Sequence, residues 1–255
     1  MLLAGCAELG LVEDSTSRSL GSPAHGSLVH AAKLPDEGAG FTTREVWKAR
    51  NNRYGTDELI ALVKGVAKRL HEHTAIRLVV GDLSSKQGGG AYAFHRSHQS
   101  GRDCDLVYFM RDKDGVEMEA DAMRVFDAHG RARDGTGITI DIPKMWLAVK
   151  ALAQSPEAPV QWIFMYEPIA QLVLDRGKEL HESDELLARV RRILKQPGDS
   201  ARHDDHFHVR VYCSPRDEGC VDLGPMEARA DWEAQWTPLA RLGARADRLD
   251  PRGWR

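Results

Sequence analysis

The sequence lacks the features that mark membrane proteins and nucleic-acid-binding proteins. It contains no run of about 18 apolar residues, so no transmembrane helix is expected. Its 255 residues include 35 basic and 38 acidic side chains, and a net charge of −3 provides no broad field that would attract nucleic acid or an anionic lipid surface. No nucleic-acid-binding motif is recognised. We therefore expect no nucleic-acid partner.

Cysteine is scarce, and its four positions leave one question open. Cys213 and Cys220 flank six residues that include Pro215 and Gly219, a composition typical of a tight loop. A disulfide there would stabilise the fold by roughly 2.5 kcal/mol in the chain-entropy model and would indicate an oxidising compartment. Two reduced thiols fit the pattern equally well. Cys104 has no obvious partner and is expected to be a small buried residue.

The N-terminus carries a candidate lipidation site. Leu3, Ala4, Gly5 and Cys6 resemble the lipobox that precedes the lipid-modified cysteine of bacterial lipoproteins. A secretory signal would also carry basic residues and a longer apolar stretch before this point, and both are missing here. Two interpretations stay open: a lipid anchor on Cys6, with the true start farther upstream, or a chance likeness.

Hydrophobic periodicity predicts a mixture of helices and strands without an internal repeat. The predicted helices span residues 56–70, 141–152, 169–174 and 185–194. The predicted strands span residues 76–80, 106–110, 160–166 and 206–212. Residues 111–140 are polar and rich in glycine, which is typical of a hairpin or an active-site loop. This order favours an α+β fold with a small, largely antiparallel central sheet and flanking helices.

Two histidine clusters each lead into a predicted strand. His206 and His208 are two residues apart on one strand, so their side chains leave the same face. Asp105 begins the other strand, and Gly101 gives the preceding loop the freedom to fold His98 back over it.

A mixed nitrogen and oxygen ligand set at this point suits zinc better than calcium, which prefers oxygen ligands only. Catalytic zinc takes three protein ligands and keeps one position for water. We therefore predict a zinc site made by His98, Asp105 and His208. The alternative is a pair of hydrogen-bonded histidine clusters that hold no metal.

The same residues carry a resemblance to a known family. His98, Gly101 and Asp105 fit the HxxGxxxD signature, and His206 and His208 the HxH signature, of the superfamily that includes lysostaphin, D-Ala-D-Ala peptidases and hedgehog proteins. Within it, the chain most resembles the penicillin-insensitive murein endopeptidases. That closer likeness is carried by residues 50–55, 81–83, 97–101 and 203–210.

The resemblance implies a periplasmic enzyme, with or without a lipid anchor, that hydrolyses the D-alanyl to meso-diaminopimelyl cross-link of peptidoglycan. By motif position, His98, Asp105 and His208 become the ligands of one Zn²⁺, and His206 stands beside the metal. His203 matches a histidine with a supporting or transition-state role. The resemblance also implies a disulfide between Cys213 and Cys220.

A second metal site is a weaker implication of the same resemblance. His95 matches a family histidine linked to such a site, but its candidate partners Asp127 and His129 do not match clearly. The likeness covers residues 27–220, which we expect to form the zinc peptidase domain. Residues 1–26 would be a tether or lipoprotein-like N-terminus, and residues 221–255 a C-terminal extension packed on the domain or trailing it.

Several polar residues near the predicted ligands are candidates for catalytic roles. His206 can act as a general base or orient water. Asp204 or Asp205 can fix the tautomer of a ligand histidine. His203 or Arg202 can bind a developing oxyanion. The alternative is a polar side chain at the surface with no catalytic role, and it stays open for Asp204, Asp205, His203 and Arg202.

Two other functions are compatible with the zinc motif. A D,D- or L,D-carboxypeptidase that trims stem peptides would use the same chemistry. A non-catalytic, zinc-containing wall-binding module is the less favoured alternative. A structural zinc site normally closes its fourth position with a protein ligand, whereas here His206 is retained beside the three predicted ligands.

Overall fold

The computed structural model describes residues 15–90, 96–198, 200–224, 226 and 229–230. Cys6 and His95 lie outside these residues, as do residues 231–255 of the expected C-terminal extension. No helix in the described part of the chain is both long enough and apolar enough to cross a lipid bilayer.

Four strands form the central sheet, in the order β13–β12–β14–β8. Their bounds are β8 (Asp103–Val107), β12 (Val160–Phe164), β13 (Leu194–Lys195) and β14 (His206–Val211). The long strand β14 runs antiparallel to both β8 and β12, and only the short β13 is parallel to its neighbour. Every residue of β8 and β12 is buried. The expected α+β fold with a small, largely antiparallel central sheet is confirmed.

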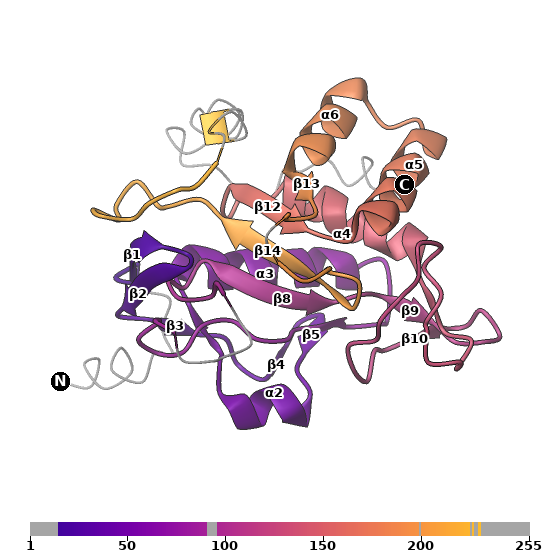
Figure 1. Ribbon diagram of the computed structural model, residues 1–255, viewed down its shortest axis with the longest axis horizontal. Helices are drawn as coiled ribbons and strands as arrows, with labels where there is room; N and C mark the ends of the chain where they lie inside the picture. The colour runs from indigo at the N-terminus through magenta and orange to yellow at the C-terminus, as the bar shows by residue number, and fades with distance from the viewer. Residues whose placement is uncertain (1–14, 91–95, 199, 225, 227–228, 231–255) are drawn as a thin grey trace.

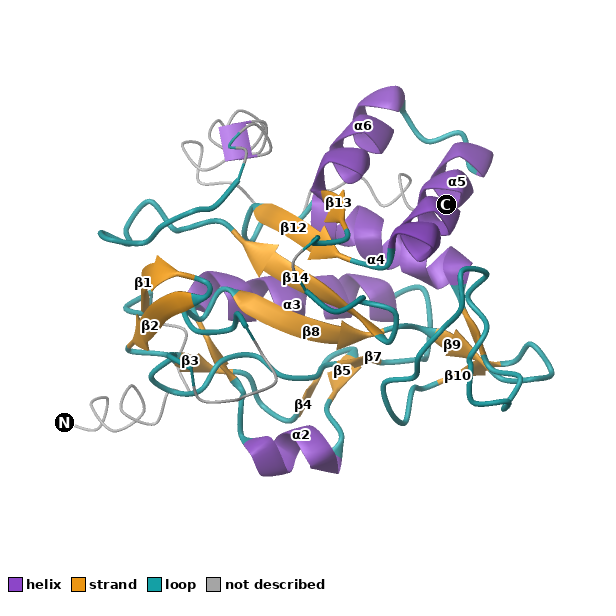
Figure 2. Ribbon diagram, in the orientation of Figure 1, coloured by secondary structure: helices purple, strands orange, loops and turns teal. Residues whose placement is uncertain are grey.

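Helices flank this sheet, as Figure 2 shows. In this view α3 and α4 run behind the strands, and α5 and α6 stand beside β13. The helices are α3 (Asp57–His71), α4 (Ile142–Ala153), α5 (Glu167–Glu179) and α6 (Asp184–Ile193).

Side-chain caps set the starts of three of these helices. Thr56, Asp141 and Ser183 each accept a hydrogen bond from the backbone N–H three residues farther on, at 3.3, 3.1 and 3.2 Å. Such a cap contributes about 1 kcal/mol. The helix predicted over residues 56–70 is confirmed as α3, with Thr56 as its N-cap. The predicted helix at 169–174 is too short, because α5 continues through a polar turn supported by ion pairs of Lys178 with Asp175 and of Arg176 with Glu179.

Short strands build the N-terminal half and a lobe beside it (Figure 1). We call residues 110–140 the charged lobe, because many of them are acidic or basic. The lobe contains β9 (Met110–Arg111), β10 (Glu117–Met118) and β11 (Thr139–Ile140), so the region 111–140 forms short paired strands and turns. The N-terminal elements are β1 (Arg18–Ser22), β2 (His25–Val29), β3 (Ala32–Lys33), β4 (Glu37–Gly38), β5 (Phe41–Thr42), α2 (Glu45–Arg50), β6 (Tyr54–Gly55) and β7 (Leu78–Val79).

The hairpin of β1 and β2 packs against the C-terminal end of the described chain. Gly21 exchanges backbone hydrogen bonds of 2.9 Å with Gly219 and Val221. The boundary that we expect after residue 26 falls inside this hairpin, because residues 18–29 form a regular antiparallel pair.

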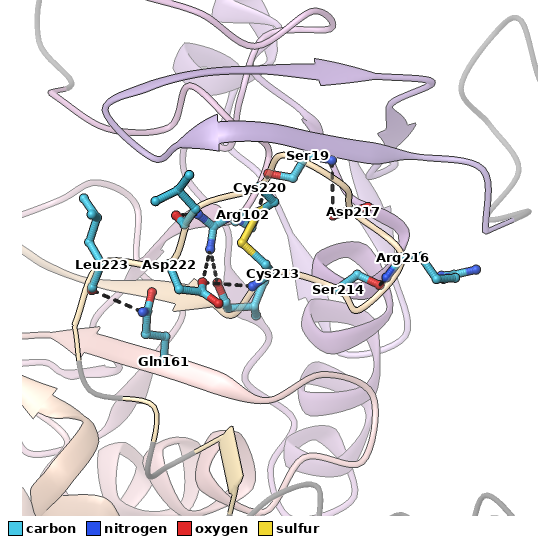
Figure 3. Close-up of a disulfide and its surroundings, with 12 residues drawn as sticks. Ser19, Arg102, Gln161, Cys213, Ser214, Arg216, Asp217, Cys220, Asp222 and Leu223 are labelled. Atoms are coloured by element: carbon cyan, nitrogen blue, oxygen red, sulfur yellow. Dashed lines mark hydrogen bonds and ion pairs between the residues drawn. A yellow bond between two sulfur atoms is a disulfide. The ribbon is translucent and has the colours of Figure 1, made fainter.

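A disulfide joins Cys213 to Cys220, as the family resemblance implies, with a Cα–Cα distance of 5.9 Å. Figure 3 shows that buried Arg102 lies beside it. The guanidinium donates to the Asp222 carboxylate at 2.8 Å and to the carbonyls of Val211 and Val221 at 3.0 and 2.9 Å. We call the disulfide, Arg102 and Asp222 the clasp, because together they fasten residues 213–222 to the start of β8.

Candidate metal centre

The pairing of β8 with β14 brings the two sequence motifs together. Asp105 lies directly opposite His208 in this antiparallel ladder. Because side chains alternate between faces, Asp103 and Asp105 share one face with His206 and His208. Cys104, Leu106, Phe207 and Val209 point the other way, and all four are buried in the core. The predicted juxtaposition of Asp105 and His208 is confirmed, although β8 starts at Asp103 and Asp105 lies within the strand.

The loop before β8 carries His98 onto the same face. His98 has a left-handed backbone, with φ of 68°, a conformation that is strained for a residue with a side chain. Gly101 also has a left-handed φ, 75°, and a β-carbon on it would lie 2.6 Å from the side chain of Leu28. The loop is held from both sides, because Gly101 N donates to Ser84 Oγ and Gly101 O accepts from Thr56 N.

Three histidine nitrogens converge on one carboxylate oxygen. Asp105 Oδ1 lies 3.2 Å from His98 Nε2, 3.1 Å from His208 Nδ1 and 3.4 Å from His206 Nε2. His98, Asp105 and His208 are all buried, whereas the side chain of His206 is 18% exposed. The facing atoms of His98, Asp105 and His208 lie within 4.8 Å of one another, as do those of His203, His206 and His208.

The opposite ring nitrogens show which tautomers the site holds. His98 Nδ1 lies 3.0 Å from the carbonyl oxygen of Leu83, which can only accept, so Nδ1 carries the hydrogen. His208 Nε2 lies 2.7 Å from Asp103 Oδ1, which fixes the ring in the same manner. In the neutral tautomers, His98 Nε2 and His208 Nδ1 therefore present lone pairs toward Asp105. Two imidazole lone pairs beside a carboxylate are a donor set that fits a divalent transition metal.

Asp103 is the residue that the sequence reasoning missed. Its fully buried carboxylate accepts from His208 Nε2, from Arg210 Nε at 2.7 Å and from the backbone N–H of His98 at 3.3 Å. Burial would raise the pKa of Asp103, but the charge of Arg210 and the contact with His208 hold that pKa far below its usual range. The signal was its place two residues before Asp105, on the same face of a strand.

We expect Asp204 or Asp205 to fix the tautomer of a ligand histidine. Asp205 instead contacts His206, the histidine beside the predicted ligands. Its carboxylate lies 2.6 Å from His206 Nδ1. Burial lowers the pKa of His206, yet the charges of Asp105 and Asp205 outweigh that effect and raise it to about 10. A cation bound at Asp105 would neutralise one of those carboxylates and so bring the pKa of His206 back down.

His203 borders the site from the turn before β14. Its ring centroid lies 5.2 Å from that of His206 and 5.8 Å from that of His208. Burial and the neighbouring histidines lower the pKa of His203 to about 3, so its imidazole is neutral. Arg202, the other oxyanion candidate, is exposed, and its guanidinium lies over the ring of Tyr166 at 5.5 Å.

Asp127 and His129 are the suggested partners of His95, but Asp127 makes hydrogen bonds within its own loop. The Asp127 carboxylate accepts from the backbone N–H groups of His129 and Arg131 at 2.8 and 2.9 Å. Among the described residues, neither belongs to a group of potential metal ligands.

Comparisons with known proteins all point to one family. The family model described as penicillin-insensitive murein endopeptidase matches residues 19–242. A protein of that name from Haemophilus influenzae is 25% identical over 225 residues, which are 85% of this chain and 71% of the relative. One from Klebsiella pneumoniae is 25% identical over 82% of this chain and 72% of its own length. One from Yersinia pestis is 26% identical over 80% and 70%. Since the family match extends over most of its length, the chain belongs to the penicillin-insensitive murein endopeptidase family.

Proposed function

We propose that this protein is a zinc peptidase that hydrolyses the peptide cross-links of peptidoglycan, with His98, Asp105 and His208 as the zinc ligands. The convergence of two fixed imidazole nitrogens on Asp105, at 3.1 and 3.2 Å, carries the proposal. The murein endopeptidases that it resembles supply the substrate class. The bond that we expect to be cut joins D-alanine to meso-diaminopimelate.

Zinc would supply a Lewis acid that polarises the scissile carbonyl and makes water acidic enough to attack near neutral pH. The partly exposed His206 stands where it can orient that water and take its proton. Asp205 holds the His206 ring in place through Nδ1 and stabilises the charge that the ring gains.

His203 is suited to stabilise the developing oxyanion. Its ring is neutral and lies against both His206 and His208. Its Nδ1 is buried and makes no hydrogen bond within the described residues, so the ring keeps a polar atom for another group. A fixed donor at an oxyanion contributes typically about 2.7–4 kcal/mol to catalysis.

The disulfide supports a periplasmic location, because such bonds persist in oxidising compartments. Lipid modification of Cys6 remains a prediction. Mass spectrometry of the N-terminus from the native host tests it, and an unmodified Met1 would exclude it.

Digestion of purified cross-linked muropeptide dimers, with and without a chelator, tests the function. We expect monomers to appear and the chelator to stop their release, with zinc restoring it. His206→Ala should keep zinc and lose cleavage, whereas His208→Ala should lose both. Loss of a terminal D-alanine from an intact dimer would favour a carboxypeptidase, and full zinc content with full activity in His208→Ala would refute the ligand assignment.

A further inference from the structure

An open pocket of about 410 Å³ lies in the charged lobe. It is lined by Ala122, Met123, Arg124, Val125, Arg133 and Asp134. Backbone pairing fixes the two lining segments relative to each other, since Arg133 N donates to Val125 O at 2.9 Å.

The pocket adjoins the metal centre. A β-carbon built on Gly81 would lie 2.9 Å from Cε of Met123 and 3.2 Å from Cβ of Asp105, so the pocket wall and the ligand approach the same point. A second link comes from Phe126, whose N–H donates to the carbonyl of Asp204 at 2.8 Å, just before β14. A substrate held at Asp105 therefore has this pocket within reach of its neighbouring residues.

Two of the three charges in the pocket cancel. Arg124 pairs with Asp134 and also with Asp121, at 2.9 Å, so its charge is neutralised. The Asp134 carboxylate accepts in addition from the backbone N–H and the hydroxyl of Thr136.

Arg133 is the charge that remains. It is exposed, and no carboxylate in the described part of the chain forms an ion pair with it. Its charge reaches the segment before β14, where Arg202 and Arg133 lower the pKa of Asp204 against the larger raising effects of burial and of Asp205. The pocket thus offers one unbalanced cation beside the apolar side chains of Met123 and Val125.

The proposed substrate carries the complementary group. Both amino groups of diaminopimelate lie one carbon from a carboxylate, so the nitrogen released from the cross-link is attached to a carbon that bears a free carboxylate. A methylene chain then leads away from that carbon. Arginine matches carboxylate geometry with two parallel N–H donors, and the methylene chain suits an apolar wall.

We propose that this pocket is a carboxylate-binding subsite in which Arg133 binds the free carboxylate next to the scissile amide, while Met123 and Val125 contact the methylene chain. The inference rests on the proposed function, and it adds a specificity determinant on the leaving-group side of the bond. An enzyme with this subsite prefers a cross-link whose carboxylate is free over one in which it is amidated.

The test uses two muropeptide dimers that differ only in that group, one with the free carboxylate and one with the carboxamide. We expect kcat/KM of the zinc-loaded protein to be at least about tenfold higher for the free carboxylate. Arg133→Gln should lower kcat/KM for that dimer by about tenfold to a hundredfold and leave the amidated dimer nearly unchanged. Arg133→Lys should retain part of the preference because it keeps the charge.

Arg131→Gln is the matched control. It removes the same charge from the same segment, but Arg131 is exposed, pairs with Asp127 at 3.1 Å and does not line the pocket, so the preference should persist. Equal cleavage of both dimers by the unaltered protein, or an equal loss on both in Arg133→Gln, would overturn the subsite alone. Cleavage of neither dimer by the unaltered protein would instead overturn the proposed function on which the subsite depends.

Discussion

Arg102 and Asp103 are neighbours at the start of β8, yet they belong to two buried polar regions with opposite character. In the clasp, Arg102 meets the single carboxylate of Asp222 and two carbonyl oxygens, so the positive charge is balanced in place. In the metal centre, Asp103 and Asp105 bring two buried carboxylates, and Arg210 is the arginine that pairs with Asp103. The partners of Asp105 are the imidazoles of three histidines. Once a bound metal holds these histidines neutral, the two carboxylates and Arg210 leave one negative charge.

This difference in charge separates a region built for stability from one built for chemistry. A buried charge that lacks a counter-charge is costly, whereas a paired and hydrogen-bonded one is tolerated. The clasp is complete with the groups of its own chain. The metal centre gains the most stability when a cation adds positive charge next to Asp105. Such a gain favours the binding of a metal ion.

The largest expected effect comes from removing the negative charge of the centre. In Asp105→Asn we expect loss of bound zinc and of essentially all cleavage, because in the proposed site the carboxylate would be both a ligand and the countercharge of the metal ion. The unaltered protein should gain about 2.7 kcal/mol of stability when zinc exceeds its Kd a hundredfold, and the variant should gain nothing. Thermal unfolding with and without zinc measures this difference. An equal gain in the variant would contradict the comparison.

Removing the arginine of the clasp should act on stability instead. Arg102→Met removes the 2.8 Å ion pair of Asp222 and leaves the longer one with Arg229 at 3.6 Å, so we expect a cost at the lower end of the about 3–5 kcal/mol that is typical when one partner of a buried pair is removed. Urea unfolding of the metal-free protein measures it. The double variant Arg102→Met with Asp222→Leu is the control, because it removes both charges and should recover much of the loss. A variant that kept its stability but lost zinc affinity would show that the clasp belongs to the metal centre.

A smaller effect is expected at Asp103, on the border between the two regions. Asp103→Asn removes the charge that orients His208, and such a change near a metal ligand lowers metal affinity by about tenfold to a hundredfold. Competition with a zinc-binding dye measures the affinity. Asp204→Asn is the matched control, since its backbone oxygen and not its carboxylate makes the contact with Phe126. Unchanged zinc affinity in Asp103→Asn would argue against its positioning role.

The predicted parts of this site are those that depend on local spacing. The interval of two between His206 and His208 and the short loop from His98 to Asp105 both lie within single motifs, so the sequence could place these side chains on common faces. The contact of His208 with Asp103 spans 105 positions and arises only when β14 pairs with β8. The spacing of two between Asp103 and Asp105 is a local signal, but it places both side chains on one face only if the strand begins at Asp103, and the predicted strand begins later.

The same distinction explains the fold. Helices with an apolar face, such as α3 and α6, were predicted almost to the residue, because periodicity reports packing against the core. The β1–β2 hairpin was missed because its strands pair with each other and with residues near Cys220, far along the chain. Its residues are mostly small and polar, so no hydrophobic pattern marked them.

The smallest expected effect concerns Asp217, which fastens the β1–β2 hairpin beside the disulfide. Its carboxylate accepts from Ser19 N at 3.2 Å (Figure 3). Burial raises the pKa of Asp217, and the negative charge of Glu58 raises it further, whereas the hydrogen bond from Ser19 lowers it by less. An acid whose pKa is higher in the folded state binds more protons there, so stability falls as pH rises from the unfolded pKa through the folded one.

Asp217→Asn keeps an acceptor for Ser19 and removes this loss. We expect the variant to be more stable near pH 7 by about 0.5 kcal/mol, with no such advantage near pH 3. Urea unfolding at both pH values tests this, and zinc affinity should not change at either. A loss of stability at pH 7 would instead mean that the charge of Asp217 strengthens the clasp. The clasp would then resemble the metal centre, because both would need their buried carboxylates to be ionised.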